Sequence, residues 1–503
     1  MALAVVKTRA VVGIEAPLVT VEVHLSNGLP GFNIVGLPEA SVREARDRVR
    51  SALINSQFEF PAKKITVNLA PADLPKEGGR FDLAIAIGIV AASGLQPEIH
   101  CDDYEFVGEL ALSGELRPVS GILPVSVAAR DAQRKLIIPQ ENGKEAMLVS
   151  DAQVFCGRNF YEVYQHLSGQ SPLAQVQACA KPEYTEAPQD MAEVIGQEQA
   201  KRALTIAAAG RHNIVFCGPP GTGKTMLASR LAGLLPAMSE KESLQTATVN
   251  SVANLPFNRE TWRQRPFRAP HHTSSAVSLV GGGSKPMPGE ISLAHNGVLF
   301  LDELTEFPRK VLDVLREPLE AGKITISRAA QKAVFPAKFQ LIAALNPSPS
   351  GDIHDGRHTP EQIIKYLNRV SGPFLDRIDL QVDVPRMSRA EFSQARMHQS
   401  QTTAQIKAQV EQARARQQHR AGKLNAELST TEVKQTCGLK EADQHFLDMA
   451  IEKLQLSIRT YQRILKVART IADLSESEQI QRQHLAEALG YRALDRIIAN
   501  LLR

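Results

Sequence analysis

The stretch HNIVFCGPPGTGKTMLASRLAGLL, at positions 212–235, decides the fold of this chain. It begins with an apolar run of strand length, turns through a loop that contains three glycines, and continues as a helix-forming run. The spacing G-x-x-x-x-G-K-[ST] is typical of a phosphate-binding loop, in which backbone N–H groups wrap the phosphates at the start of a helix. Because the motif stands between a strand and a helix, we interpret it as an ATP site and not as a chance glycine turn.

Two residues of this loop have a specific chemical task. Lys224 would reach the outer phosphates, and the hydroxyl of Thr225 would hold Mg²⁺. The residues expected to surround the nucleotide are Gly218, Pro219, Pro220, Gly221, Thr222, Gly223, Lys224, Thr225 and Met226.

Two further apolar runs end in polar side chains that suit the same site. The run at 298–301 leads to Asp302, which would hold Mg²⁺ together with Thr225, and to Glu303, which would polarise the attacking water. The run at 339–345 ends at Asn346, which would orient the same water or, because a proline follows, simply form a turn. Ligands bind at the carboxyl ends of parallel strands, so we expect all these groups around one nucleotide.

Composition and length are those of a water-soluble protein with two or three domains. The chain has 503 residues, of which 43% are apolar and 22% charged. Its five scattered cysteines form no C-x-x-C pair, and its apolar runs are too short to cross a bilayer, so we expect a cytoplasmic protein with no membrane role. The net charge of +4 does not identify nucleic acid as a partner, so any basic site must be local.

Hydrophobic periodicity divides the chain into three blocks of an α/β protein. Residues 1–168 mix strand and helix patterns, as in an α+β domain, and Val19, Val21 and Val23 alternate with polar residues. Residues 169–190 contain three prolines and no periodicity, which indicates a linker. Residues 191–388 repeat strand, loop and helix as in a parallel α/β domain, and residues 389–503 are almost entirely helical in pattern.

Many segments of the chain resemble AAA+ ATPases of the magnesium-chelatase-like branch and, within it, the ComM/YifB family. The markers are VIGQ at 194–197, RPFRAPHH at 265–272, GEISLAHNGVLFLDEL at 289–304, GPFLDRIDL at 372–380 and SIRTYQRILKVARTIADL at 457–474. The resemblance covers essentially the whole chain. It implies an N-terminal Lon-protease-like domain, a central AAA+ P-loop domain and a C-terminal helical lid.

The resemblance also assigns residues around the nucleotide. It implies that Ile195 and Gly196 lie beside the adenine and that Asn346 senses the γ-phosphate. It makes Arg459 a second sensor on the helical lid. Relatives often carry a cysteine cluster after the sensor asparagine, whereas this chain has PSPSG at 347–351, so we expect no structural zinc there.

Arg377 is implied to be an arginine finger that reaches the ATP of a neighbouring subunit. A guanidinium supplied across an interface would stabilise the charge on the transferred phosphoryl group and would couple hydrolysis to assembly. Without the resemblance, an ordinary surface ion pair with Asp376 or Asp379 would explain this arginine equally well.

The first block is similar to the Lon-protease fold but lacks the groups needed for peptide hydrolysis. Its stretch PKEGGRFD, at 75–82, matches the segment that carries the nucleophilic serine in those proteases. Arg80 and Leu123 occupy the positions of the serine and the lysine. An arginine can neither attack a carbonyl nor lose its proton at working pH, so we expect this domain to be catalytically silent.

A basic hairpin pattern lies between the carboxylate pair and the third strand. Residues 323–338 alternate, with four basic residues and no acidic ones. In this branch such a hairpin points into a central pore, where Arg328 and Lys332 would grip DNA phosphates without reading sequence; the alternative is a solvated hairpin with no ligand. His271 and His272 would point to opposite sides of a strand, so we interpret them as interface or DNA-facing residues and not as metal ligands.

The resemblance implies a homohexameric ring that uses ATP and Mg²⁺ to move DNA. Within the family, this is a helicase that promotes branch migration of recombination intermediates during natural transformation. The alternative, from a different functional class, is a motor that remodels a protein partner, as the chelatase subunit does for metal insertion into a porphyrin.

Overall fold

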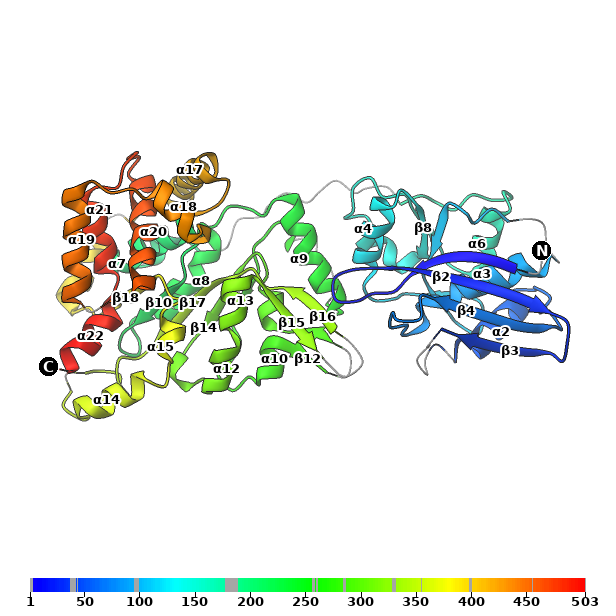
Figure 1. Ribbon diagram of the computed structural model, residues 1–503, viewed down its shortest axis with the longest axis horizontal. Coiled ribbons are helices and arrows are strands. Elements are labelled where there is room, and N and C mark those ends of the chain that lie inside the picture. Colours follow the sequence, from blue (N-terminus) through cyan, green and yellow to red (C-terminus); the bar gives the residue numbers. More distant parts are fainter. Residues whose placement is uncertain are drawn as a thin grey trace.

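The computed structural model of the chain describes residues 3–36, 42, 44–94, 99–176, 189–255, 258, 261–283, 286–327, 332–353, 355–397, 400–454 and 456–502. Three regions follow one another along its long axis: an N-terminal domain, a central α/β domain and a group of helices (Figure 1). This architecture is the one predicted from the sequence, and it is confirmed. The boundaries at 168, 190 and 388 stay predictions, and residues 177–188 of the linker lie outside the described residues.

A mixed sheet of seven strands forms the centre of the N-terminal domain, in the order β3-β4-β2-β1-β5-β8-β9. Strand β2 is antiparallel to β1 and β4, and the other neighbours are parallel. Val19, Val21 and Val23 of β2 are all buried, which confirms the predicted alternation. The strands are β1 (Leu3–Arg9), β2 (Leu18–Ser26), β3 (Gly31–Val35), β4 (Lys64–Ala70), β5 (Tyr104–Phe106), β8 (Lys135–Pro139) and β9 (Val154–Gly157).

Helix α3, Asp82–Ser93, packs on strands β1 and β2 of this sheet. It is buried almost throughout because its sequence is apolar on every side. A turn of 3₁₀ helix, Gly79–Phe81, precedes it and carries Arg80. The domain also contains α2 (Ala45–Asn55), α4 (Ile122–Asp131), α5 (Gly143–Ala146), α6 (Phe160–Leu167) and the short strands β6 (Glu109–Leu110) and β7 (Leu116–Arg117).

The central domain is built on five parallel strands in the order β11-β14-β17-β10-β18. Strands β10, β14 and β17 are buried along their whole length, as expected for parallel strands that are covered on both faces. The predicted strands at 298–301 and 339–345 are thereby found, the second beginning one residue later. The strands are β10 (Ile214–Cys217), β11 (Phe267–Arg268), β14 (Val298–Leu301), β17 (Gln340–Leu345) and β18 (Leu380–Asp383).

Helices and two small hairpins surround this sheet. The predicted basic hairpin forms from β15 (Lys323–Ser327) and β16 (Lys332–Pro336), and β12 (Gly281–Gly282) pairs with β13 (Met287–Pro288). The helices are α7 (Glu198–Gly210), α8 (Lys224–Leu234), α9 (Glu240–Val252), α10 (Ala276–Val280), α11 (Glu290–Leu293), α12 (Arg309–Val314), α13 (Arg316–Ala321), α14 (Pro360–Leu367) and α15 (Gly372–Leu375).

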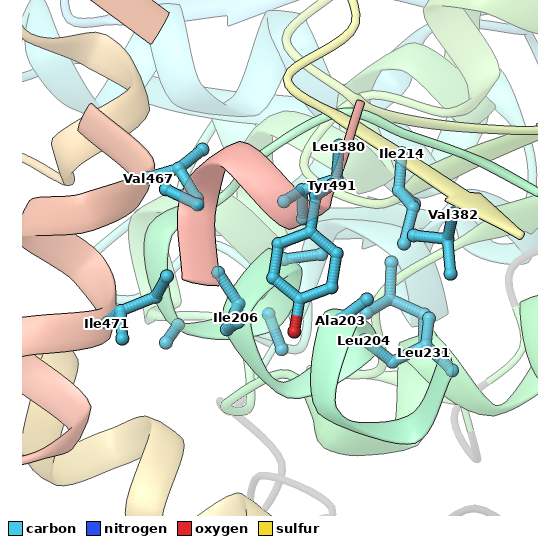
Figure 2. Packing of buried hydrophobic residues seen from close by; sticks show 14 of the residues in the cluster. Ala203, Leu204, Ile206, Ile214, Leu231, Leu380, Val382, Val467, Ile471 and Tyr491 are labelled. Carbon is cyan, nitrogen blue, oxygen red and sulfur yellow. The ribbon is translucent and has the colours of Figure 1, made fainter. Parts of the chain in front are cut away.

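The C-terminal helices share one apolar core with the central domain. Val467 and Ile471 of α20 pack with Ile206 of α7, and Tyr491 lies next to residues of β10 and β18 (Figure 2). Helix α17 packs on both α7 and α8. The helices are α16 (Arg389–Met397), α17 (Thr403–Ala421), α18 (Thr430–Thr436), α19 (Glu441–Lys453), α20 (Ile458–Leu474), α21 (Arg482–Gly490) and α22 (Ala493–Leu501). No helix in the described ranges is both long and apolar enough to span a bilayer.

The N-terminal domain contacts the central domain through the loop after β1 and through α4. Ile14 of this loop packs on the central core, and a Cβ at Gly13 would lie 2.9 Å from the carbonyl oxygen of Val334 in β16. Helix α4 lies beside α9, where Ser150 also donates a hydrogen bond to Glu240 at 2.9 Å. The hairpin β15–β16 is therefore on the side of the central domain that faces the N-terminal domain (Figure 1).

Candidate nucleotide-binding site

The carboxyl ends of three neighbouring strands bring the predicted nucleotide-site residues together. Strand β17 lies between β10 and β14, with Leu345 opposite Cys217 and Ala343 opposite Leu301. The glycine loop follows β10, the two carboxylates follow β14, and Asn346 follows β17. The parallel register therefore gathers side chains that are more than 120 positions apart in sequence, as Lys224 and Asn346 are.

The glycine loop holds Lys224 at the start of α8. The Nζ of Lys224 donates hydrogen bonds to the carbonyl oxygens of Gly218 at 2.6 Å and Pro219 at 2.8 Å, and to Oδ1 of Asn346 at 3.1 Å. Gly223, which precedes the helix, has φ +86°, a conformation that a residue with a Cβ rarely adopts. Burial lowers the pKa of Lys224. A largely buried ammonium group with only neutral acceptors is suited to take an anionic phosphate as its partner.

Thr225 and Asp302 form a pair that fits Mg²⁺. The hydroxyl of Thr225 donates to Oδ2 of Asp302 at 2.8 Å. A hydroxyl and a carboxylate, both oxygen donors, are the protein groups that hold Mg²⁺ beside a nucleotide in P-loop proteins. The two residues predicted as metal ligands therefore lie in contact, and their donor types match the ion.

Glu303 makes a contact that was not predicted from the sequence. Its backbone is left-handed, with φ +50°, and its N–H donates to Oδ1 of Asp302 at 2.9 Å. Its Oε2 lies 2.9 Å from Nδ1 of His272, whose ring is 4.1 Å from that of His271. The expectation that the two histidine rings point to opposite sides assumed a strand, but β11 ends at Arg268, and His272 lies next to the carboxylate; the interpretation of both histidines as interface or DNA-facing residues stays a prediction.

The proposed adenine side is formed by the loop before α7. Gly196 has φ +65°, and a Cβ there would lie 2.4 Å from Cε of Met387. Gln197 donates through its side chain to the carbonyl oxygen of Pro385 at 3.0 Å. Ile195 is half-buried. The loop is thus held against the segment that follows β18, next to the strand that leads into the glycine loop.

Arg377 lies at the opposite edge of the sheet from the glycine loop, just before the amino end of β18. Its Nη2 pairs with Oε1 of Glu320 in α13 at 2.6 Å, and its Nη1 donates to the carbonyl oxygen of Pro373 at 2.5 Å. The structure records an ion pair of Arg377 with Glu320 and none with Asp376 or Asp379. Its side chain is only 13% exposed.

Arg459 is exposed on the first turn of α20. Within the described residues it forms no ion pair, so its guanidinium is available for another group. Its role as a second sensor stays a prediction.

Of the two predicted DNA contacts, Lys332 lies on the hairpin that faces the N-terminal domain. Arg328 lies outside the described residues. Lys332 is the first residue of β16, is exposed, and lines a cavity of about 360 Å³ between the hairpin and the N-terminal domain. Arg80 lines the same cavity and donates to the carbonyl oxygen of Ser120 at 2.7 Å, while Leu123 is fully buried in α4. Neither side chain supplies a nucleophile or a base for peptide hydrolysis.

Comparisons with known proteins agree with this geometry. Residues 190–392 match the family described as magnesium chelatase, subunit ChlI, and residues 21–142 and 400–492 match two further ChlI descriptions. The chain is 56% identical to the competence protein ComM of Haemophilus influenzae, with 100% of this chain and 99% of that protein covered. It is 52% identical, over 100% of this chain and 99% of the relative, to YifB of Salmonella typhimurium.

The magnesium chelatases themselves are more distant. The 38 kDa subunit from Cereibacter sphaeroides is 26% identical over 31% of this chain and 51% of that subunit. Membership of this branch implies ATP hydrolysis, in agreement with the assembled site. With its full-length relatives, its family matches and its phosphate-binding loop, the chain belongs to the ComM/YifB family of magnesium-chelatase-like AAA+ ATPases.

Proposed function

We propose that this chain is the subunit of a cytoplasmic, homohexameric motor that uses ATP and Mg²⁺ to translocate on DNA and to promote branch migration of recombination intermediates in natural transformation. The observation that carries the proposal is the distance between the phosphate-binding residues and Arg377 within one chain. The phosphate-binding residues lie at the carboxyl ends of the strands, and Arg377 lies at the amino end of β18. One subunit would therefore need the arginine of another.

The residues divide the chemistry between two subunits. Lys224 binds the outer phosphates, and Thr225 with Asp302 would hold Mg²⁺, which neutralises phosphate charge during transfer. Glu303 accepts a proton from the attacking water, and Asn346 orients that water near the γ-phosphate. Arg377 of the adjacent subunit donates hydrogen bonds to the transferred phosphoryl group, and Arg459 of the lid contacts the same nucleotide from the binding subunit.

Two observations favour DNA as the polymer that is moved. The Haemophilus relative is named as a competence protein, and we carry that role to this chain because the two proteins match from end to end. The hairpin β15–β16 presents Lys332 as an exposed cation, and a cation of this kind can hold phosphates irrespective of base sequence.

The test is a strand-unwinding and three-strand junction-migration assay with purified protein, ATP and Mg²⁺, beside the Lys224→Ala variant. We expect junction migration by the wild type only, and ATP hydrolysis that is stimulated by single-stranded or forked DNA and falls with added salt. Hydrolysis that responds only to a protein partner, with no migration, would support a remodelling motor of the chelatase kind and would refute the DNA motor.

A further inference from the structure

A buried carboxylate, Asp379, lies two positions after Arg377. Its Oδ1 accepts a hydrogen bond from Nη1 of Arg463 at 2.5 Å, and its Oδ2 accepts one from the backbone N–H of Asn213 at 2.9 Å. The side chain is 5% exposed. Burial alone would raise the pKa of Asp379, but the Arg463 guanidinium holds that pKa below its ordinary value. The pair is therefore a charged contact between the Arg377 segment and α20.

Asn213 ties the same segment to two strands of the active site. Its side-chain Nδ2 donates to the carbonyl oxygen of Arg377 at 3.1 Å, and its Oδ1 accepts from the backbone N–H of Leu341 in β17 at 2.9 Å. Asn213 immediately precedes β10, which leads into the glycine loop, and β17 leads to Asn346. The backbone that carries Arg377 is thus fixed to the strands that carry the phosphate-binding residues.

Helix α20 reaches the segment from the lid. Arg463 follows Arg459 by four residues, so both lie on one face of the helix. Two turns further, Thr470 lies 2.7 Å from Nε2 of the buried His212, the residue before Asn213. The apolar face of α20 is held independently in the shared core. The Asp379–Arg463 pair therefore links the helix that carries Arg459 to the segment that carries Arg377.

We infer that Asp379 is a positioning residue for the arginine that each subunit donates to its neighbour. It fixes the Arg377 segment to the lid helix, so that movement of the lid over one nucleotide moves the guanidinium that serves the next. This inference rests on the proposed function, because it assumes that Arg377 acts in the adjacent subunit. Its specific consequence is that loss of the pair damages the donated arginine and leaves the subunit's own nucleotide site intact.

The first experiment measures hydrolysis by rings made only of Asp379→Asn or only of Arg463→Gln subunits. We expect kcat to fall about 10- to 100-fold, the cost of a misplaced catalytic group, while the nucleotide dissociation constant stays within about twofold of the wild type. The double variant should be no slower than the slower single variant, because both changes remove the same charge pair between Asp379 and Arg463. A wild-type kcat in both single variants, or additive losses in the double variant, would overturn the inference.

The second experiment supplies an intact arginine in trans. Each variant is diluted into about a tenfold excess of Lys224→Ala subunits, which cannot bind nucleotide but carry Arg377 and Asp379, so nearly every active site faces a normal donor. We expect Asp379→Asn sites to recover the rate of wild-type subunits diluted in the same way. A residue that only stabilises its own fold gains nothing from a normal neighbour, so a failure to recover would refute the positioning role.

Arg377→Ala subunits in the same mixtures separate this inference from the proposed function. If the hydrolysis rate of Arg377→Ala subunits recovers and that of Asp379→Asn subunits does not, the positioning role of Asp379 is refuted. The proposal that Arg377 acts in the adjacent subunit then still stands. If Arg377→Ala itself does not recover, the proposed function fails. Thermal unfolding of each variant is measured first, and if Asp379→Asn does not fold, Arg463→Gln, whose side chain is 25% exposed, decides the test.

Discussion

The replacement of Glu303 by Gln should stop hydrolysis without disturbing the fold. The Glu303 side chain is 54% exposed, and its contact with His272, 30% exposed, is the kind of solvent-screened pair that contributes less than about 1 kcal/mol to stability. Glutamine has the same shape and keeps a polar group next to His272. Both the unfolding temperature and the affinity for ATP should therefore be close to those of the wild type.

Catalysis should respond very differently, because an amide cannot accept the proton of the attacking water. Loss of a general base costs about 10²- to 10⁴-fold in rate, which corresponds to about 3 to 5 kcal/mol in activation free energy. Phosphate release under saturating ATP measures kcat, a fluorescent nucleotide measures affinity, and light scattering measures assembly. We expect a ring that holds ATP and does not turn over.

Glu306→Gln is the matched control, since Glu306 lies three residues after Glu303, at the end of the 3₁₀ helix Leu304–Glu306. Its side chain is 45% exposed and pairs with Arg369 at 3.4 Å, and its backbone N–H, which the substitution leaves unchanged, donates to the carbonyl oxygen of Glu303. Its kcat should stay within about twofold of the wild type, as for an exposed ion pair. If Glu303→Gln retained more than a tenth of the wild-type kcat, Glu303 would not be the group that activates water.

Three further changes test the remaining groups. Lys224→Ala removes the ammonium group that contacts Gly218, Pro219 and Asn346, so binding of a fluorescent ATP analogue should be lost. Thr225→Val keeps the shape of the side chain but removes the hydroxyl that bonds to Asp302. A Mg²⁺ titration of ATP hydrolysis should therefore show half-maximal activity at a higher Mg²⁺ concentration. An unchanged midpoint would exclude Thr225 as a ligand of the ion. Lys332→Ala should lower the slope of log affinity for single-stranded DNA against log salt by about 0.7, the contribution of one phosphate contact, whereas an unchanged slope would place DNA elsewhere.

The candidate nucleotide site was predictable because each of its parts is local in sequence. GPPGTGKT specifies a loop, and the apolar runs before Asp302 and Asn346 specify buried strands. The general rule that ligands bind at the carboxyl ends of parallel strands then brings these parts together without any knowledge of the strand order. The structure adds the contacts between them, such as the hydrogen bond from Thr225 to Asp302.

The contacts of His272 and Arg377 were not predictable in this way. His272 meets Glu303 because β11 lies beside β14, and β11 has only two residues, too few to give a pattern in the sequence. Arg377 pairs with Glu320, which is 57 positions away, because α13 happens to pack beside that segment. Composition and spacing favoured the neighbouring Asp376 or Asp379, and only tertiary packing selects the actual partner.

The packing partners of the C-terminal helices were not predictable from the sequence either. Its helical pattern was evident, but an apolar stripe on a helix does not specify what covers it. Here α17 and α20 cover α7, so that the lid and the ATPase share one core. A lid that is packed in this way cannot move without a response in the helix that it covers, since close-packed interiors transmit displacement.

The position of Arg377 relative to the sheet argues against hydrolysis by a single chain. It precedes the amino end of β18, whereas the glycine loop follows the carboxyl end of the adjacent β10. The four residues of β18 span about 13 Å at the rise of a parallel strand, which is longer than an arginine side chain. No rotation of the side chain alone can therefore bring the guanidinium to its own subunit's phosphates. Glu320 pairs with the largely buried guanidinium instead, and in the proposed ring the phosphate of an adjacent subunit, as a stronger anion, would displace this carboxylate.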